Sequence, residues 1–185
     1  MGIASDVLVV GGGLAGITAA LSAAREGADV RLVSHKESTL GQASGLIDAL
    51  GYLPATDAPG DDPTLTPTAG RTGARTERPD ATGPLVDPFE GVPDLPPDHP
   101  YRLVGADALA EGLALFDEVT DGYRGAHTER NALVPTFGGT VKPTARYPAA
   151  VAAGLASDRR PMLVVGFRSL TGFDGRLTAE RLAAA

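Results

Sequence analysis

The stretch Asp6-Val7-Leu8-Val9-Val10-Gly11-Gly12-Gly13-Leu14-Ala15-Gly16 is the strongest indication of a fold in this 185-residue chain. Residues 7–10 form an uninterrupted apolar run, which predicts a β-strand buried on both faces. Gly11, Gly13 and Gly16 then have the spacing G-x-G-x-x-G. In that spacing the first glycine permits a tight turn, the second lets a pyrophosphate approach the backbone, and the third lets a helix pack closely on the strand. The stretch therefore predicts a strand, a turn and a helix.

The residues that follow complete this pattern. An Ala-rich helix is expected over residues 17–26, and Gly27 is typical of the position just after a helix. Residues 29–33 have the composition of a second strand, so the segment predicts a βαβ unit. Backbone N–H groups at the start of such a helix face a phosphate with a positive partial charge. The predicted nucleotide-phosphate site consists of Gly11, Gly13, Leu14, Ala15 and Gly16.

Ser34 occupies the position that usually recognises an adenosine ribose. An Asp or Glu at the end of the second strand normally accepts hydrogen bonds from that ribose. Three interpretations remain open: a 2′-phosphate held by Ser34 and Lys36, as in an NADP site; a ligand without the adenosine half, such as FMN; or FAD bound through other groups. We include Ser34 among the candidate cofactor-binding residues.

Composition excludes several classes of function. The formal net charge of −7 argues against a nucleic-acid-binding surface, which needs clustered cations. The absence of Cys excludes disulfides, a Cys-ligated iron–sulfur cluster and a thiol nucleophile. No metal site and no catalytic acid or base is assigned, because His35, His99 and His127 stand in contexts typical of surface residues. No apolar run approaches the length of a transmembrane helix, so we expect a cytoplasmic protein without direct membrane insertion.

The composition divides the chain into three regions. Residues 1–54 contain the βαβ nucleotide-binding unit. Residues 55–98 are rich in Pro, Asp and Thr, and their few large apolar residues predict an extended, partly disordered insertion. Residues 99–185 are expected to continue the α/β domain.

Weaker signals lie outside the glycine-rich stretch. In residues 38–45, small side chains would let the backbone approach a planar ligand, with Ser44 and Gly45 as N–H donors. The alternative is a mobile loop that leads into a short helix over residues 46–50. Lys142 and Arg146 place cations near a predicted hairpin, and exposed strand-end charges are favoured there over contacts with a phosphate.

Further elements are predicted in the last region from caps, periodicity and turn residues. Asp107 is expected to cap a helix over residues 108–119, and Asp174 a helix over residues 175–184. Residues 130–142 have the pattern of two short strands around a Gly-Gly turn. Residues 161–167 form a mostly apolar run, which predicts another buried strand.

Five segments, in this order, resemble the B subunit of the anaerobic glycerol-3-phosphate dehydrogenase complex: residues 9–16, 43–48, 99–105, 135–144 and 163–174. The resemblance covers nearly the whole chain except the Pro-rich region. It implies an α/β, Rossmann-like FAD/NAD(P)-binding fold. Because members of this family are more than twice as long, it also implies an N-terminal portion of the family sequence, with a fold that is incomplete at the C-terminus.

The same resemblance implies a function. The cofactor would be FMN, with FAD as the alternative. The A subunit of the complex would oxidise glycerol 3-phosphate to dihydroxyacetone phosphate, and the C subunit would carry iron–sulfur clusters that lead to quinone. The B subunit would pass electrons between them, peripheral to the inner face of the membrane. Two other interpretations are an independent FAD- or NADP-dependent oxidoreductase and a non-catalytic fragment that retains only its docking to the other subunits.

Overall fold

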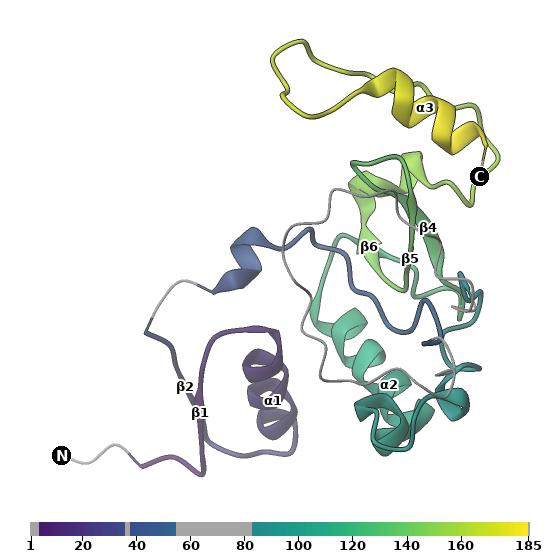
Figure 1. Ribbon diagram of the computed structural model, residues 1–185. Helices are drawn as coiled ribbons and strands as arrows, with labels where there is room; N and C mark the ends of the chain where they lie inside the picture. The colour runs from purple at the N-terminus through teal and green to yellow at the C-terminus, as the bar shows by residue number, and fades with distance from the viewer. Residues whose placement is uncertain (1–3, 36–37, 55–82, 185) are drawn as a thin grey trace, which may run out of the picture. The chain divides into compact units, whose positions relative to one another are not determined.

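The computed structural model describes residues 4–35, 38–54 and 83–184 (Figure 1). The chain divides into two compact units, Met1–Leu46 and Ile47–Ala185, and each is described by itself. The boundary between the two units, after Leu46, thus precedes residue 54, where the first region proposed from composition ends. Residues 55–82 of the proposed insertion lie outside the described residues.

The first unit contains the predicted βαβ arrangement. Strand β1 (Val7–Val10) is followed by helix α1 (Leu14–Arg25) and strand β2 (Val30–Val33). The two strands are parallel, with Val7 opposite Val30. The expected α/β, Rossmann-like unit is therefore confirmed, although α1 begins three residues earlier than its periodicity suggested. A short 3-10 helix, η1 (Thr39–Gln42), follows in the same unit.

The prediction that β1 is buried on both faces is wrong. Leu8 is 58% exposed and Val10 79% exposed. Among the described residues the sheet has only two strands, and α1 packs on one face of it. Within this unit, no described element covers the opposite face of the sheet.

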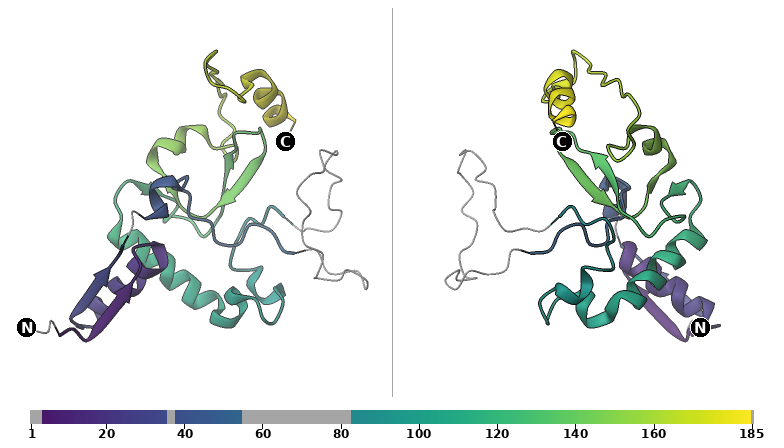
Figure 2. Two further views of the ribbon diagram at one scale, coloured as in Figure 1. Left: turned by 60° about the vertical axis from the view of Figure 1, so that its left-hand side comes forward. Right: turned by 90° about the vertical axis from the view of Figure 1, so that its right-hand side faces the viewer.

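The core of the second unit includes residues that composition had assigned to a flexible insertion. Leu50, Val92 and Leu95 are buried together, and Val92 begins the 3-10 helix η2 (Val92–Asp94). This segment packs on the first half of helix α2 (Pro100–Val119), as two further views show (Figure 2). The segment 83–98 is thus folded in spite of its prolines, because its few apolar side chains meet others from distant parts of the chain.

Helix α2 begins with a helical stretch that the sequence patterns did not predict. Its N-cap is His99, whose Nδ1 accepts a hydrogen bond from the Tyr101 N–H at 3.1 Å, and Pro100 occupies the first helical position, which suits proline. Gly105, with φ +84° and ψ +165°, is not helical and divides α2 into two helical stretches. The second stretch begins close to Asp107 and contains the predicted helix over residues 108–119. Among the described hydrogen bonds, none shows Asp107 capping it.

The strands of the second unit form two small antiparallel ladders. The predicted hairpin is confirmed as β4 (Ala132–Pro135) and β5 (Val141–Thr144). Strand β3 (Tyr123–Arg124) pairs with β6 (Tyr147–Pro148), which leads into the 3-10 helix η3 (Ala149–Gly154).

The expected helix over residues 46–50 is absent. The Ile47 N–H donates to the Arg146 carbonyl at 2.8 Å, and the Arg146 N–H donates to the Ile47 carbonyl at 2.9 Å. This bridge keeps the backbone out of a helical conformation, so a long-range pairing overrides the local pattern.

The C-terminal helix is confirmed as α3 (Gly175–Ala183), with Asp174 Oδ1 accepting from the N–H groups of Arg176 and Leu177 at 3.0 Å each. The strand predicted over residues 161–167 is wrong. In the described part of the chain no strand pairs with this segment, and Leu163 is 88% exposed.

Candidate functional site

The glycine turn after β1 has the geometry that its spacing predicted. Gly11 has φ +117°, a conformation that residues with a side chain rarely adopt. Its N–H donates to the Val33 carbonyl at 2.8 Å, which ties the turn to the end of β2. The turn is therefore held at the edge where both parallel strands end.

The other two glycines of the motif differ in their surroundings. A Cβ on Gly16 would lie 2.0 Å from the Gly11 carbonyl oxygen, so α1 packs directly on the turn. A Cβ on Gly13 would have no described atom within 4 Å. Space is thus open where the second glycine of such a motif faces a ligand.

The start of α1 offers backbone donors to an anion. The first helical hydrogen bond runs from the Ile17 N–H to the Gly13 carbonyl at 3.0 Å. The N–H groups of Leu14, Ala15 and Gly16 come before it and therefore have no acceptor within the helix. No described side chain caps this end, and the first turn contains no acidic residue. Free amides and the positive end of the helix dipole fit the phosphates of a flavin or dinucleotide.

Ser34 lies against this turn. A Cβ on Gly12 would be 3.2 Å from both Cβ and Oγ of Ser34. The structure therefore brings Ser34 together with the glycines, and it presents a neutral hydroxyl where related sites present a carboxylate. Lys36, the phosphate ligand of the NADP interpretation, lies outside the described residues.

Ser44 and Gly45 are not brought to the glycine turn by any described hydrogen bond. Ser44 Oγ accepts from the Leu46 N–H at 3.3 Å, and Gly45 has φ +78°. These two residues therefore form a local turn. Their role in cofactor binding stays a prediction.

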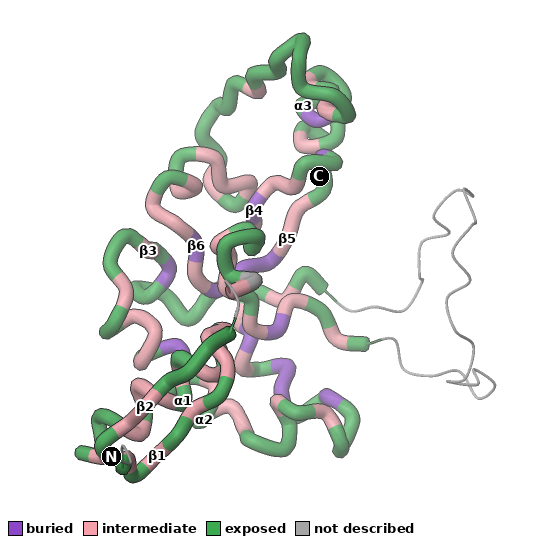
Figure 3. Tube along the Cα trace, turned by 90° about the vertical axis from the view of Figure 1, so that its left-hand side faces the viewer, coloured by how far each residue is buried: buried purple, intermediate pink, exposed green. Residues whose placement is uncertain are grey.

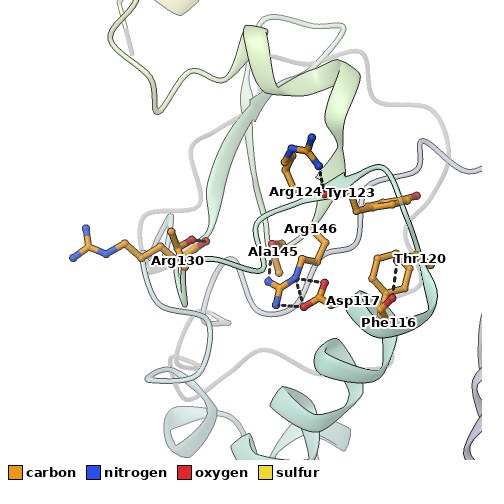
Figure 4. Close-up of polar contacts among 9 residues, drawn as sticks. Phe116, Asp117, Thr120, Tyr123, Arg124, Arg130, Ala145 and Arg146 are labelled. Atoms are coloured by element: carbon orange, nitrogen blue, oxygen red, sulfur yellow. Dashed lines mark hydrogen bonds and ion pairs between the residues drawn. The ribbon is translucent and has the colours of Figure 1, made fainter.

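The second unit contains a charged pair that the sequence did not reveal. Arg146 Nε donates to both carboxylate oxygens of Asp117 at 2.8 and 3.0 Å, and its Nη2 donates to Oδ2 at 2.8 Å (Figure 4). The side chains are only 11% and 22% exposed. The expectation of an exposed charge at Arg146 is therefore wrong, because Asp117 comes from α2 and their pairing depends on the tertiary structure.

Asp48 neutralises the other candidate cation. Lys142 Nζ lies 2.5 Å from Asp48 Oδ2, and the fully buried Thr144 donates from Oγ1 to Asp48 Oδ1 at 3.0 Å. Asp48 lies in the segment 43–48, and Lys142 and Thr144 lie in the segment 135–144. Both segments resemble the dehydrogenase B subunit, and this resemblance was the only sequence signal for the cluster. Both Lys142 and Arg146 thus have carboxylate partners, and neither is a free phosphate ligand here.

The described residues contain neither a membrane-spanning helix nor a metal cluster. No helix in this part of the chain is long and apolar enough to cross a membrane. Within the same residues, no group of three or more His, Cys, Asp or Glu side chains is placed to hold a metal ion.

Comparison with protein families matches residues 6–184 to the FAD binding domain family. The chain belongs to this family. The match confirms the Rossmann-like interpretation of the glycine turn and supports a flavin as the cofactor. It does not favour FMN, since the family is described by FAD.

Comparison with curated proteins confirms the resemblance stated from the motifs. A protein of Halobacterium salinarum, described as the probable B subunit of an anaerobic glycerol-3-phosphate dehydrogenase, is 52% identical over 185 residues, which are 100% of this chain and 38% of that protein. The B subunit of the Vibrio cholerae dehydrogenase is 33% identical over 116 residues, or 63% of this chain and 21% of that protein. The B subunit of the Pasteurella multocida dehydrogenase is 25% identical over 184 residues, or 96% of this chain and 37% of that protein.

The chain thus spans 38% of the length of the Halobacterium relative. Each of these relatives is described as one member of a multi-subunit dehydrogenase, which implies that it works with other subunits. No solved structure matches the chain.

Proposed function

We propose that this chain binds a flavin at the glycine turn and that it serves in a flavin-linked dehydrogenase acting on glycerol 3-phosphate. The main support for the flavin site is the start of α1, which no described side chain caps and which packs directly on the turn at Gly16. The match to the FAD binding domain family over residues 6–184 agrees with it. The substrate comes from the descriptions of the relatives.

The described residues have distinct parts in this proposal. The N–H groups of Leu14, Ala15 and Gly16 would hold the phosphates, and the open side of Gly13 would let the ligand reach them. Ser34 would contact a ribose hydroxyl from the end of β2. When bound, a flavin supplies the redox centre that accepts and passes on electrons, while the protein binds and orients it.

We propose FAD as the flavin. The family match supports this choice, and the Ser34 hydroxyl can donate to or accept from a ribose hydroxyl even though it lacks a carboxylate's charge. FMN, which would need no adenosine contact, is the competing outcome.

The proposal extends to an assembly. Partners corresponding to the A and C subunits would deliver electrons from glycerol 3-phosphate and take them to a quinone, at the cytoplasmic face of a membrane. Because the chain spans 38% of its Halobacterium relative, we propose that this activity needs further polypeptide.

A reconstitution experiment tests the flavin site. Purified chain is titrated with FAD and with FMN, and binding is followed by flavin fluorescence. Gly13→Ala places a methyl group in space that is empty in the protein but would face the phosphates, so we expect at least a tenfold loss of affinity with unchanged circular dichroism. Gly112→Ala, at another glycine with no described atom near its Cβ position, is the matched control and should bind like the parent.

Two results would contradict the proposal: no binding of either flavin by the parent chain, or equal binding by the Gly13→Ala variant. Tighter binding of FMN than FAD would leave the site in place and correct the choice of flavin. The electron-transfer role has a separate test, because glycerol 3-phosphate should bleach the bound flavin only when the other subunits are present.

A further inference from the structure

The segment 161–167 exposes a regular set of apolar side chains. Leu163, Val165 and Phe167 are 88%, 59% and 68% exposed. They stand at every second position, the spacing that puts side chains on one face of a β-strand. Figure 3 shows that this stretch, which leads to α3, is mostly exposed. Three large apolar side chains in such a row are unusual on a free surface.

The backbone of this segment is also unpaired. Among the described residues, no backbone hydrogen bond involves residues 161–166, and the Phe167 carbonyl accepts only from Leu170 N–H, at 3.0 Å. A Cβ on Gly175 would lie 3.4 Å from the Gly166 nitrogen, so the segment is held against the start of α3. An anchored segment with free N–H and C=O groups is a template for the addition of a strand.

An apolar cavity adjoins the same segment. It has a volume of about 520 Å³ and lies between the end of β4, η3, the segment itself and α3. Its lining includes Phe137, Met162, Val164, Phe173 and Leu182. The ring centroids of Phe137 and Phe173 are 5.1 Å apart, so part of the wall is already packed. Side chains of an added strand could be buried there.

Arginines stand at both ends of the segment. Arg160 forms an ion pair with Asp158, with Nη2 2.6 Å from Oδ2. The hydrogen bond from Arg160 lowers the pKa of the Asp158 carboxyl group. Arg159 and Arg168 are exposed, and neither has a described carboxylate partner. An added strand would therefore meet a positive charge at each end and would be favoured by acidic residues there.

We propose that residues 161–167 are a docking edge for an apolar β-strand with acidic ends, supplied by the polypeptide that corresponds to the part of the curated relatives that this chain does not span. The Halobacterium relative matches the whole of this chain, including the segment, and most of its length lies outside the match, where such a strand has room. This inference does not depend on flavin binding, because none of its residues belongs to the glycine turn.

Hydrogen–deuterium exchange tests the pairing directly. Exchange is measured on this chain alone, on this chain co-expressed with the remaining part of the Halobacterium relative as a second polypeptide, and on the full-length relative. We expect the amides of residues 162–166 to exchange freely in the chain alone. They should exchange at least a hundredfold more slowly in the co-purified pair, and so should the aligned segment of the full-length relative. The β4–β5 hairpin should be protected in all three samples.

Two matched variants test the apolar face. Val165→Asp should lower co-purification or affinity at least tenfold, because it places a charge where the added strand would bury an apolar side chain. Val104→Asp is the control, because Val104 is 60% exposed on α2, nearly the same as Val165 at 59%. A third variant, with both Arg159 and Arg168 changed to Glu, should weaken the association through the charges at the ends.

Several results would overturn the proposal. One is rapid exchange of the aligned segment in the full-length relative, a measurement that does not require the remaining part to fold alone. Another is a homodimer of this chain that protects residues 162–166, which would make a second copy the occupant. Equal effects of Val165→Asp and Val104→Asp would show that the apolar face is not the contact.

Discussion

A single methyl group added at Gly16 should destabilise the βαβ unit. Its Cβ would lie 2.0 Å from the Gly11 carbonyl oxygen, so Gly16→Ala forces α1 away from the turn. We expect a loss of stability of about 1–3 kcal/mol, the usual cost of forcing extra volume into a packed site. Hydrogen exchange of the β1 and α1 amides would measure it. Gly13→Ala, which meets no described atom, should leave these amides unchanged; equal loosening by both variants would contradict the argument.

Asn131 joins three separate stretches of backbone. Its Nδ2 donates to the carbonyls of Leu50 and Leu85 at 2.9 and 3.0 Å, and its N–H donates to the Val86 carbonyl at 2.8 Å. Asn131→Ala should lower the free energy of unfolding by about 1–3 kcal/mol, because two carbonyls lose their side-chain donor. Urea denaturation measures the change.

The control for Asn131 is Thr128→Ala, since Thr128 Oγ1 makes only an exposed 3.4 Å contact with the Arg130 carbonyl. Its unfolding free energy should stay close to that of the parent. Asn131→Asp should be at least as damaging as Asn131→Ala, because Oδ1 of Asn131 is buried without a partner and a charged oxygen there would be uncompensated.

The Arg146 and Asp117 pair should be far more sensitive than the exposed pairs of the chain. Arg146→Ala leaves the Asp117 carboxylate largely buried without its partner, and breaking such a pair typically costs about 3–5 kcal/mol. Arg176→Ala breaks the Arg176 and Glu180 pair, whose side chains are 89% and 61% exposed, and should cost roughly 0–1 kcal/mol. Thermal unfolding of both variants compares them; similar shifts would mean that burial does not strengthen the first pair.

Among the elements of the second unit, the described stretches that flank residues 55–82 are held together. The Leu85 N–H donates to the Gly51 carbonyl at 2.8 Å, and Asn131 bonds to the carbonyls of Leu50 and Leu85. A Cβ on Gly83 would lie 2.4 Å from Cδ1 of Tyr52, which shows how closely the two stretches approach.

Because these flanking stretches meet, replacing residues 55–82 by a short Gly-Ser linker should leave the second unit folded. We expect a melting temperature within a few degrees of the parent, since closing a shorter loop costs little. Differential scanning calorimetry would measure it, and the same replacement in the Asn131→Ala background should be less well tolerated. A collapse of the melting transition in the single replacement would show that residues 55–82 contribute to the core.

At the scale of the whole molecule, the two units should respond differently to a ligand. All the described flavin contacts that we propose lie within residues 11–34, in the unit Met1–Leu46. Saturating FAD should therefore slow hydrogen exchange in β1, α1 and β2, because a ligand stabilises the folded form that binds it. The amides of α2 and of the β4–β5 hairpin should show little change; uniform protection of both units would contradict this prediction.

Elements with local signals could be predicted from the amino-acid sequence alone. The G-x-G-x-x-G spacing predicted the strand, turn and helix at β1 and α1, the Gly-Gly pair predicted the β4–β5 hairpin, and Asp174 predicted the start of α3. Each of these depends on residues close together in the chain, such as a cap that bonds two or three positions away. The order of such segments was also enough to find the family.

Burial and long-range pairing depend on the tertiary structure. The apolar runs at β1 and at residues 161–167 have the composition of buried strands, yet they are exposed here because burial depends on neighbours that a local pattern does not contain. Conversely, Val92 and Leu95 became core residues within a Pro-rich segment. The partners of Arg146 and Lys142, Asp117 and Asp48, lie far away in sequence and meet them only in the folded chain.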